Sequence, residues 1–222
     1  MSRDRYHSCL RVAPVLAASL VLLGCTGNIL PGALTEPTKL YVLTPKSTFT
    51  PDLPKVDWQL TVDVPIAEAG LNTTRIALRH SPISLEYYER ANWVDTAPIM
   101  VQTLLVESFE NSGRIVGVGR QSIAIRSDFA LITDLREFQA EYGRGIVPEA
   151  RVRLTAKLIR MPERVIVGVT TIERRQKAAG GDLESVVEAF DMALGKTMKR
   201  IVEWALKAPK KQPRGRTGPR RR

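Results

Sequence analysis

Residues 150–160 read ARVRLTAKLIR, and residues 165–174 read VIVGVTTIER. Apolar and polar residues alternate along the first stretch, which is typical of a β-strand with one buried face and one wet face. The apolar set is Val152, Leu154, Ala156 and Leu158, and the polar set is Arg151, Arg153, Thr155 and Lys157. Residues 161–163 predict a tight turn into the second stretch, where Val165, Val167 and Val169 fall on one side.

Other strands are predicted earlier in the chain. Residues 129–138 form a long strand candidate that a glycine-containing turn follows at 142–145, and residues 58–64 alternate until Pro65 stops them. Shorter candidates lie at 39–43, 75–80, 84–88 and 115–118. The three long strands at 129–138, 150–160 and 165–174 predict an antiparallel meander with one packed face.

Two amphipathic helices are predicted. The first covers about 95–112, where Asp95 or Thr96 can cap it, Pro98 fits the first turn and Gly113 ends it. The second covers 182–206 after a glycine pair. Apolar side chains recur at spacings of three and four in both helices, at Val101, Leu104, Leu105 and Phe109 and at Leu183, Val186, Val187, Phe190, Leu194, Met198, Ile201 and Ala205.

The elements together predict a two-layer α+β domain. Its sheet is expected to be largely antiparallel, with both helices packed on one face. The expected core contains Val101, Leu104, Phe109, Val186, Phe190, Leu194 and Ile201. The opposite face then exposes Arg151, Arg153 and Lys157. We expect this face or the sheet edge, in place of a deep pocket, to contact a partner.

The N-terminus has the three parts of a secretory signal. Residues 1–11 contain three arginines, residues 12–23 are almost wholly apolar, and Gly24 and Cys25 follow. The apolar run is too short for a transmembrane helix, which needs about 20 residues. The ending Leu-Leu-Gly-Cys resembles a bacterial lipobox, in which the cysteine becomes the acylated first residue. An ordinary secretory signal with an incidental cysteine is the alternative.

The net positive charge of the chain lies in its two terminal segments, and the region between them is neutral. The chain of 222 residues has a formal charge of +10, of which residues 207–222 carry eight and residues 1–25 carry two. The body therefore has no net charge, which argues against a nucleic-acid surface. We expect a signal peptide at 1–24, a lipidated tether at 25–37, one domain at 38–206 and a disordered basic tail at 207–222.

Motifs for catalysis or metal binding are missing from the sequence. The mature chain contains one histidine, His80, and no thiol besides Cys25, which argues against a structural zinc site. No G-x-S-x-G or Walker A sequence occurs, so His80 is expected to be a polar residue at a strand end. The carboxylates Glu107, Glu110, Asp134, Glu137 and Glu141 are expected on solvated outer faces. We therefore predict no catalytic residue, metal or cofactor.

Taken in order, several segments of the chain resemble the ABC-type transport auxiliary lipoprotein family. They are the lipobox at Cys25, YVL at 41–43, YYERANWV at 87–94 before a helix, FENSG at 109–113, LREF at 135–138, and Trp204 in the terminal helix. The resemblance covers about 38–206, and the basic tail departs from it. It implies a non-enzymatic accessory lipoprotein that works beside an MCE-domain protein, an ABC permease and an ATPase in envelope lipid transport.

The resemblance also carries an expectation about location. In similar lipoproteins an Asp after the cysteine retains the protein in the inner membrane, so Thr26 implies the outer membrane with the body in the periplasm. Two alternatives stay open, a periplasmic hydrolase and a structural lipoprotein that helps to assemble an outer-membrane complex. Homo-oligomerisation also stays open.

Overall fold

The computed structural model describes residues 37–120 and 126–208, so Cys25, the predicted signal peptide, nearly all of the tether and nearly all of the basic tail lie outside the described residues. The two helices are α2 (Ala97–Ser112) and α3 (Leu183–Lys207). The strands are β1 (Lys39–Tyr41), β2 (Gln59–Val62), β3 (Ile66–Ala67), β4 (Arg75–Arg79), β5 (Glu86–Trp93), β6 (Gly117–Arg120), β7 (Phe129–Glu141), β8 (Glu149–Arg160) and β9 (Val165–Lys177).

All of these strands belong to one sheet that is built around β7. One edge of β7 pairs antiparallel with β8 along its whole length, and β8 pairs antiparallel with β9. The other edge of β7 pairs parallel with β2, β3 and β4 in succession. Further out in the sheet, β6 pairs with β2, β5 pairs with β4, and β1 pairs with β5. The meander β7–β8–β9 is confirmed.

The predicted α+β fold is confirmed, but the sheet is mixed, because its N-terminal half contains parallel pairs. β2 and β6 are parallel, as are β1 and β5, whereas β4 and β5 are antiparallel. Parallel neighbours need a crossover connection, and α2 forms part of the one that leads from β2 to its parallel neighbour β6. Alternation of apolar residues indicates which face of a strand is buried but not the direction of its partner, so the pattern could not reveal this.

The helix ends follow the predicted caps in most respects. Thr96 occupies the N-cap position of α2 without a side-chain cap bond, and Gly113 ends the helix in the left-handed region at φ 59°. In α3 the Asp182 carboxylate accepts a hydrogen bond from the backbone N–H of Ser185 at 2.9 Å. Both helices therefore begin and end within two residues of the expected bounds.

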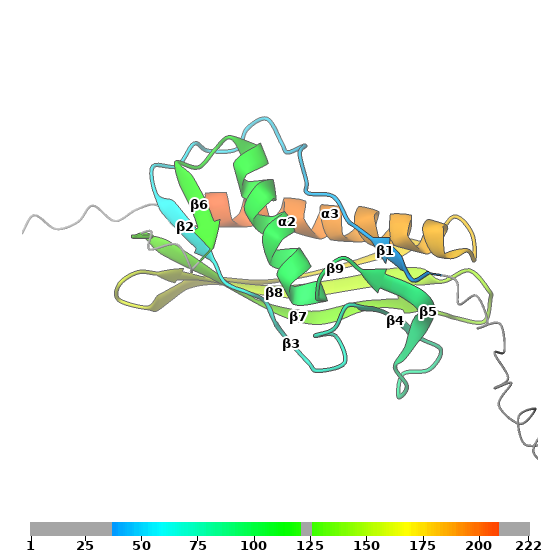
Figure 1. The fold of residues 1–222 in the computed structure, drawn as a ribbon. Coiled ribbons are helices and arrows are strands. Elements are labelled where there is room, and N and C mark those ends of the chain that lie inside the picture. The colour runs from blue at the N-terminus through cyan, green and yellow to red at the C-terminus, as the bar shows by residue number, and fades with distance from the viewer. Residues whose placement is uncertain (1–36, 121–125, 209–222) are drawn as a thin grey trace, which may run out of the picture. The chain divides into compact units, whose positions relative to one another are not determined.

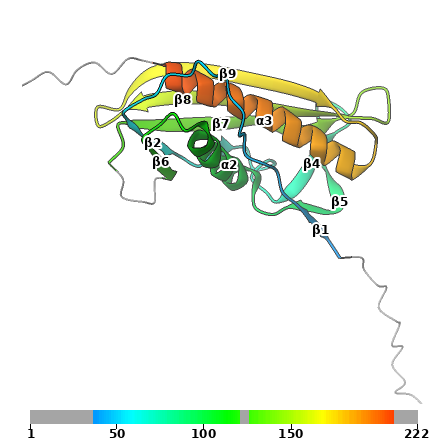
Figure 2. The same ribbon diagram turned by 90° about the horizontal axis from the view of Figure 1, so that it is seen from above.

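The two helices lie on the same side of the sheet, as Figures 1 and 2 show, with α3 over β8 and β9. All seven residues expected in the core are buried in one cluster. At its centre the Trp93, Phe138 and Phe190 rings come from β5, β7 and α3, and their centroids are 5.1 to 5.6 Å apart. This aromatic cluster joins both halves of the sheet to the long helix.

The three valines of β9 do not share one side, contrary to the sequence pattern. The pairing register shifts between Leu158 and Ile159, so that Val167 packs against the core while Val165 and Val169 are exposed. Gly168 faces α3, where a Cβ on this residue would lie 3.1 Å from the Trp204 indole. A β-bulge, which inserts one residue on one strand, accounts for the broken alternation.

Removing the Phe190 side chain should destabilise the domain strongly. Phe190→Ala would leave a cavity between Trp93 and Phe138, and such truncations cost about 3 to 5 kcal/mol. We expect the thermal unfolding midpoint to fall by roughly 10 °C in calorimetry. Met192→Ala on the exposed side of the same helix is the matched control and should shift it little. Equal shifts would mean that the aromatic cluster does not hold the domain together.

Candidate functional site

The sheet face that points away from the helices carries the residues that the sequence analysis selected. Arg151, Arg153 and Lys157 all project from β8 on this side, opposite the buried Val152 and Leu154. They are not free cations, however, because each lies beside at least one carboxylate. The Arg151 side chain keeps only 18% of its surface exposed.

Arg151 lies at the centre of an ionic network. Its Nε donates to Oε1 of Glu173 at 2.9 Å, and one terminal nitrogen donates to Oε1 of Glu141 at 2.9 Å. The other terminal nitrogen lies 3.8 Å from Glu137. Arg175 closes the network, donating to Oε2 of Glu141 at 2.9 Å and to Glu173 at 3.3 Å. Three strands are thereby joined by side chains as well as by backbone bonds.

Arg153 and Lys157 occupy the same face with weaker links. Arg153 lies 3.8 Å from Glu173, and the Nζ of Lys157 donates to Asp134 at 3.2 Å. Arg136 donates to the same Asp134 oxygen at 3.4 Å. We call this whole surface the charged face, and its members are Asp134, Arg136, Glu137, Glu141, Arg151, Arg153, Lys157, Glu173 and Arg175.

The expectation that Asp134, Glu137 and Glu141 are merely solvated is wrong. A register shift in β7 between Leu135 and Glu137 places Arg136 in a bulge, after which Glu137 and Glu141 point to the charged face. Gln139 is buried between them and donates to both, at 2.7 and 3.1 Å. Complementary charges in β7 and β8 are a signal in the sequence, but only the register shows which charges meet.

The network changes the acidity of its members. Burial opposes ionisation of Glu141, but hydrogen bonds from Arg151 and Gln139 and the charges of Arg151 and Arg175 outweigh it and lower the pKa. Glu173 behaves in the same way, since burial is outweighed by Arg151 and Arg175 and its pKa is lowered. Both side chains are therefore held as carboxylates at neutral pH.

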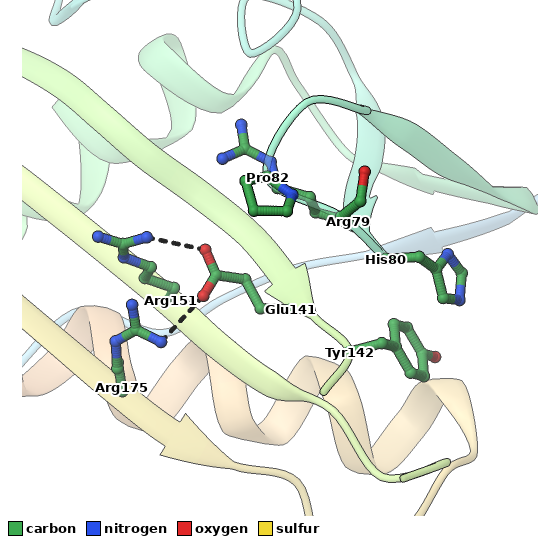
Figure 3. A pocket seen from close by; sticks show the side chains of 8 residues that line it. Arg79, His80, Pro82, Glu141, Tyr142, Arg151 and Arg175 are labelled. Atoms are coloured by element: carbon green, nitrogen blue, oxygen red, sulfur yellow. Dashed lines mark hydrogen bonds and ion pairs between the residues drawn. The ribbon is translucent and has the colours of Figure 1, made fainter. Parts of the chain in front are cut away.

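A pocket of about 300 Å³ lies where the charged face meets the loop after β4. Figure 3 shows the Glu141 carboxylate between the Arg151 and Arg175 guanidinium groups on one side of it. The lining residues are Arg79, His80, Ser81, Pro82, Glu141, Tyr142, Arg151 and Arg175. Most of these side chains carry charged or polar groups, a lining that suits an acyl chain poorly.

His80 follows β4 directly, as expected for a residue at a strand end. Its ring stacks on Tyr142 with centroids 4.7 Å apart, and Nδ1 lies 3.4 Å from Oε1 of Glu86. The Tyr142 hydroxyl lies 2.9 Å from that of Tyr88, and burial together with this hydrogen bond raises the pKa of Tyr88. These contacts fasten two loops to each other and place no nucleophile beside a base.

Among residues 37–120 and 126–208, no group of three or more His, Cys, Asp or Glu side chains could hold a metal ion. Within the same ranges no helix is long and apolar enough to cross a membrane.

The ionic network should stabilise the domain in a pH-dependent manner. The folded-state pKa values of Glu141 and Glu173 lie below the ordinary 4.5, so their contribution is complete above that pH and is lost as the pH falls through the lowered values. We expect Arg151→Met to reduce the free energy of unfolding by about 1 to 3 kcal/mol at pH 7.

The difference between Arg151→Met and the wild type should shrink when urea unfolding is repeated at pH values below about 4. Lys157→Met is the matched control. Lys157 pairs with Asp134, and its replacement should reduce the free energy of unfolding by less than about 1 kcal/mol. If Arg151→Met reduces the free energy of unfolding equally at pH 7 and at pH 3, the stabilisation by Arg151 is not electrostatic.

Solved structures share this fold. The domain superposes on the crystal structure of protein XCC0632 from Xanthomonas campestris with a TM-score of 0.72, at 33% identity, over 76% of this chain and 94% of that one. A crystal structure described as an uncharacterized protein matches with a TM-score of 0.61 at 12% identity, over 77% and 99% of the chains. The second likeness is to the fold alone.

Sequence comparison places the chain in a family. The uncharacterized protein bll6063 of Bradyrhizobium diazoefficiens is 28% identical over 117 residues, which span 52% of this chain but only 31% of that protein. The family model described as "ABC-type transport auxiliary lipoprotein component" matches residues 41–202. This match covers most of the described domain, and the chain therefore belongs to the family of ABC-type transport auxiliary lipoproteins.

Proposed function

We propose that the protein is a non-catalytic, periplasmic accessory lipoprotein of a system that moves lipids across the bacterial envelope. In this proposal it works beside an MCE-domain protein, an ABC permease and an ATPase. The family match over residues 41–202 carries the proposal, because it covers nearly the whole domain and describes a transport auxiliary component. The geometry of the site agrees, since its charged residues bind one another and hold strands together.

The proposal includes an anchor in the outer membrane. The segment that ends in Leu-Leu-Gly-Cys at 22–25 has the order of parts of a lipoprotein signal, and Thr26 follows in place of an Asp. One acyl chain of moderate length holds a protein only marginally, so stable attachment needs a second one. An acylated Cys25 that carries several chains meets this requirement.

Two surfaces of the domain suit contact with a protein partner. The charged face carries Arg153 and Lys157 partly exposed. The strand β9 pairs only with β8 among the described residues, so its second edge has backbone groups available, with Val165 and Val169 exposed beside it. One partner could contact the charged face and the second edge of β9 together, because both include residues of β9.

Replacing the proposed anchor residue should release the protein from the membrane. We expect Cys25→Ser to abolish acyl labelling and to move the protein from the envelope fraction to the soluble periplasmic fraction. A serine hydroxyl at this position cannot form the thioether through which a lipobox cysteine is acylated. The measurement is metabolic labelling with a fatty acid followed by fractionation and salt washing. A mutant that stays in the membrane after washing would disprove the proposed anchor.

Reversing charges on the charged face should weaken partner binding. We expect Arg153→Glu with Lys157→Glu to reduce co-purification with an MCE-domain protein several-fold, while circular dichroism is unchanged. Lys196→Glu with Arg200→Glu on the exposed side of α3 is the matched control and should leave co-purification intact.

Charge reversal at Lys157 also introduces a repulsion with Asp134, which could lower stability by itself. The neutral pair Arg153→Gln with Lys157→Gln avoids this repulsion and should weaken binding in the same direction. If all three double variants bind like the wild type, the partner contacts another surface.

A further inference from the structure

Four segments meet at one end of the domain. They are β1, the loop 80–85 between β4 and β5, the loop 142–148 between β7 and β8, and the start of α3. Figures 1 and 2 show all four at the same end, opposite the turn between β8 and β9. The described chain also begins here, at Pro37, so we call this part the tether end.

Direct contacts link these segments into one surface. The stacking of His80 on Tyr142 places the loop 80–85 beside the loop 142–148. Gly181 lies so close to the backbone oxygen of Ile146 that a Cβ would come within 3.1 Å of it, which places the start of α3 beside the same loop. The Tyr41 hydroxyl donates to Glu184 at 3.1 Å and brings β1 to the first turn of α3.

The loops and strand of the tether end expose large aliphatic side chains. Ile83 is 98% exposed and Ile146 is 84% exposed, each near the tip of its loop, and Leu40 on β1 is 64% exposed. Isoleucine is among the residues most often fully buried, so two that project from adjacent loops are unusual for a surface that faces only water. The domain therefore presents apolar tips at the end where the tether joins it.

The segment after β1 holds the start of the domain in place. The backbone N–H and the hydroxyl of Thr44 both donate to the Asp191 carboxylate on α3. The backbone N–H of Lys46 donates to the Ser108 hydroxyl on α2 at 2.9 Å. Leu43, which lies in the chain between β1 and Thr44, is buried. Figure 2 shows this segment running across both helices. The tether consequently enters at a fixed point of the body.

The length of the tether limits how far this point can lie from an acylated cysteine. Cys25 and Lys39 are separated by fourteen chain steps, and an extended chain spans at most about 3.5 Å for each step. The greatest distance is therefore about 50 Å, and any less extended tether brings the tether end closer. An anchored chain thus keeps the side of the domain with exposed isoleucines within about 50 Å of the lipid.

We propose that the tether end docks on the surface of the lipid bilayer, with Ile83 and Ile146 inserted among the lipids. The inference rests on the proposed acylation of Cys25. Charged side chains of both signs surround the two isoleucines, among them Arg144, Glu86 and Asp182, so insertion depends on apolar contact more than on attraction to anionic lipid. The exposed start of β9 then points away from the bilayer, toward a partner.

Single-site labelling tests this orientation. The acylated mature chain has no free thiol, so Ile83→Cys, Ile146→Cys and Glu163→Cys each introduce one position for a polarity-sensitive dye. Each labelled lipoprotein is placed in vesicles of phosphatidylethanolamine with a minority of phosphatidylglycerol and spin-labelled acyl chains. We expect quenching several-fold stronger at positions 83 and 146 than at position 163, in the turn between β8 and β9.

A second tether separates this inference from the anchor itself. In a chain with a histidine tag in place of Cys25, bound to a nickel-chelating lipid, the same quenching pattern is expected. If the native chain does not float with vesicles but the tagged chain shows the pattern, the acyl anchor is wrong and the docking stands. If either chain is vesicle-bound and all three positions are quenched equally, the docking is wrong and the anchor stands.

Variants test whether the isoleucines themselves insert. With the dye at Arg144→Cys, Ile83→Asp with Ile146→Asp should reduce quenching to the level at position 163. Val165→Asp with Ile166→Asp, exposed aliphatic residues at the other end of the domain, is the matched control and should leave the quenching unchanged. If the dye at position 144 is still quenched in the variant with Ile83→Asp and Ile146→Asp, at low and at high salt, these side chains do not insert.

Discussion

Hydrogen bonding along both edges of β7 is the constraint on which the rest of the structure depends. One edge carries β8 for its whole length, while the other carries β2, β3 and β4 one after another. The strands that follow attach to these, so the whole sheet is organised by a single strand of thirteen residues. Its inward side chains include Phe138, whose ring contacts Phe190 of α3, while the body of that helix lies over β8 and β9.

A single bulge gives the two faces of this strand their different characters. The shift at Arg136 lets Phe138 point to the core while Glu137 and Glu141 point outward to the arginines of β8 and β9. Carboxylates and guanidinium groups of the charged face therefore satisfy one another across three strands. The outer face of this part of the sheet is consequently charged, whereas its inner face is apolar.

The two ends of the domain differ in a manner that fits an anchored accessory protein. The described chain begins at the end that carries Ile83 and Ile146, and Thr44 and Lys46 fasten it to both helices. The far end carries the β8–β9 turn and the exposed start of β9. If lipid holds the protein at this end, as proposed, the other end faces the rest of a transport assembly, together with the edge of β9 that pairs with no described strand.

Local patterns in the sequence determined the helices with their ends, the meander β7–β8–β9, the seven core residues and the outward position of Arg151, because periodicity and capping act between near neighbours. Strand direction, the bulges at Arg136 and Val167, and the partners of Glu141 were decided only by the tertiary structure. Each depends on register between segments far apart in the chain, and a shift of one residue turns a side chain to the other face without changing the local pattern.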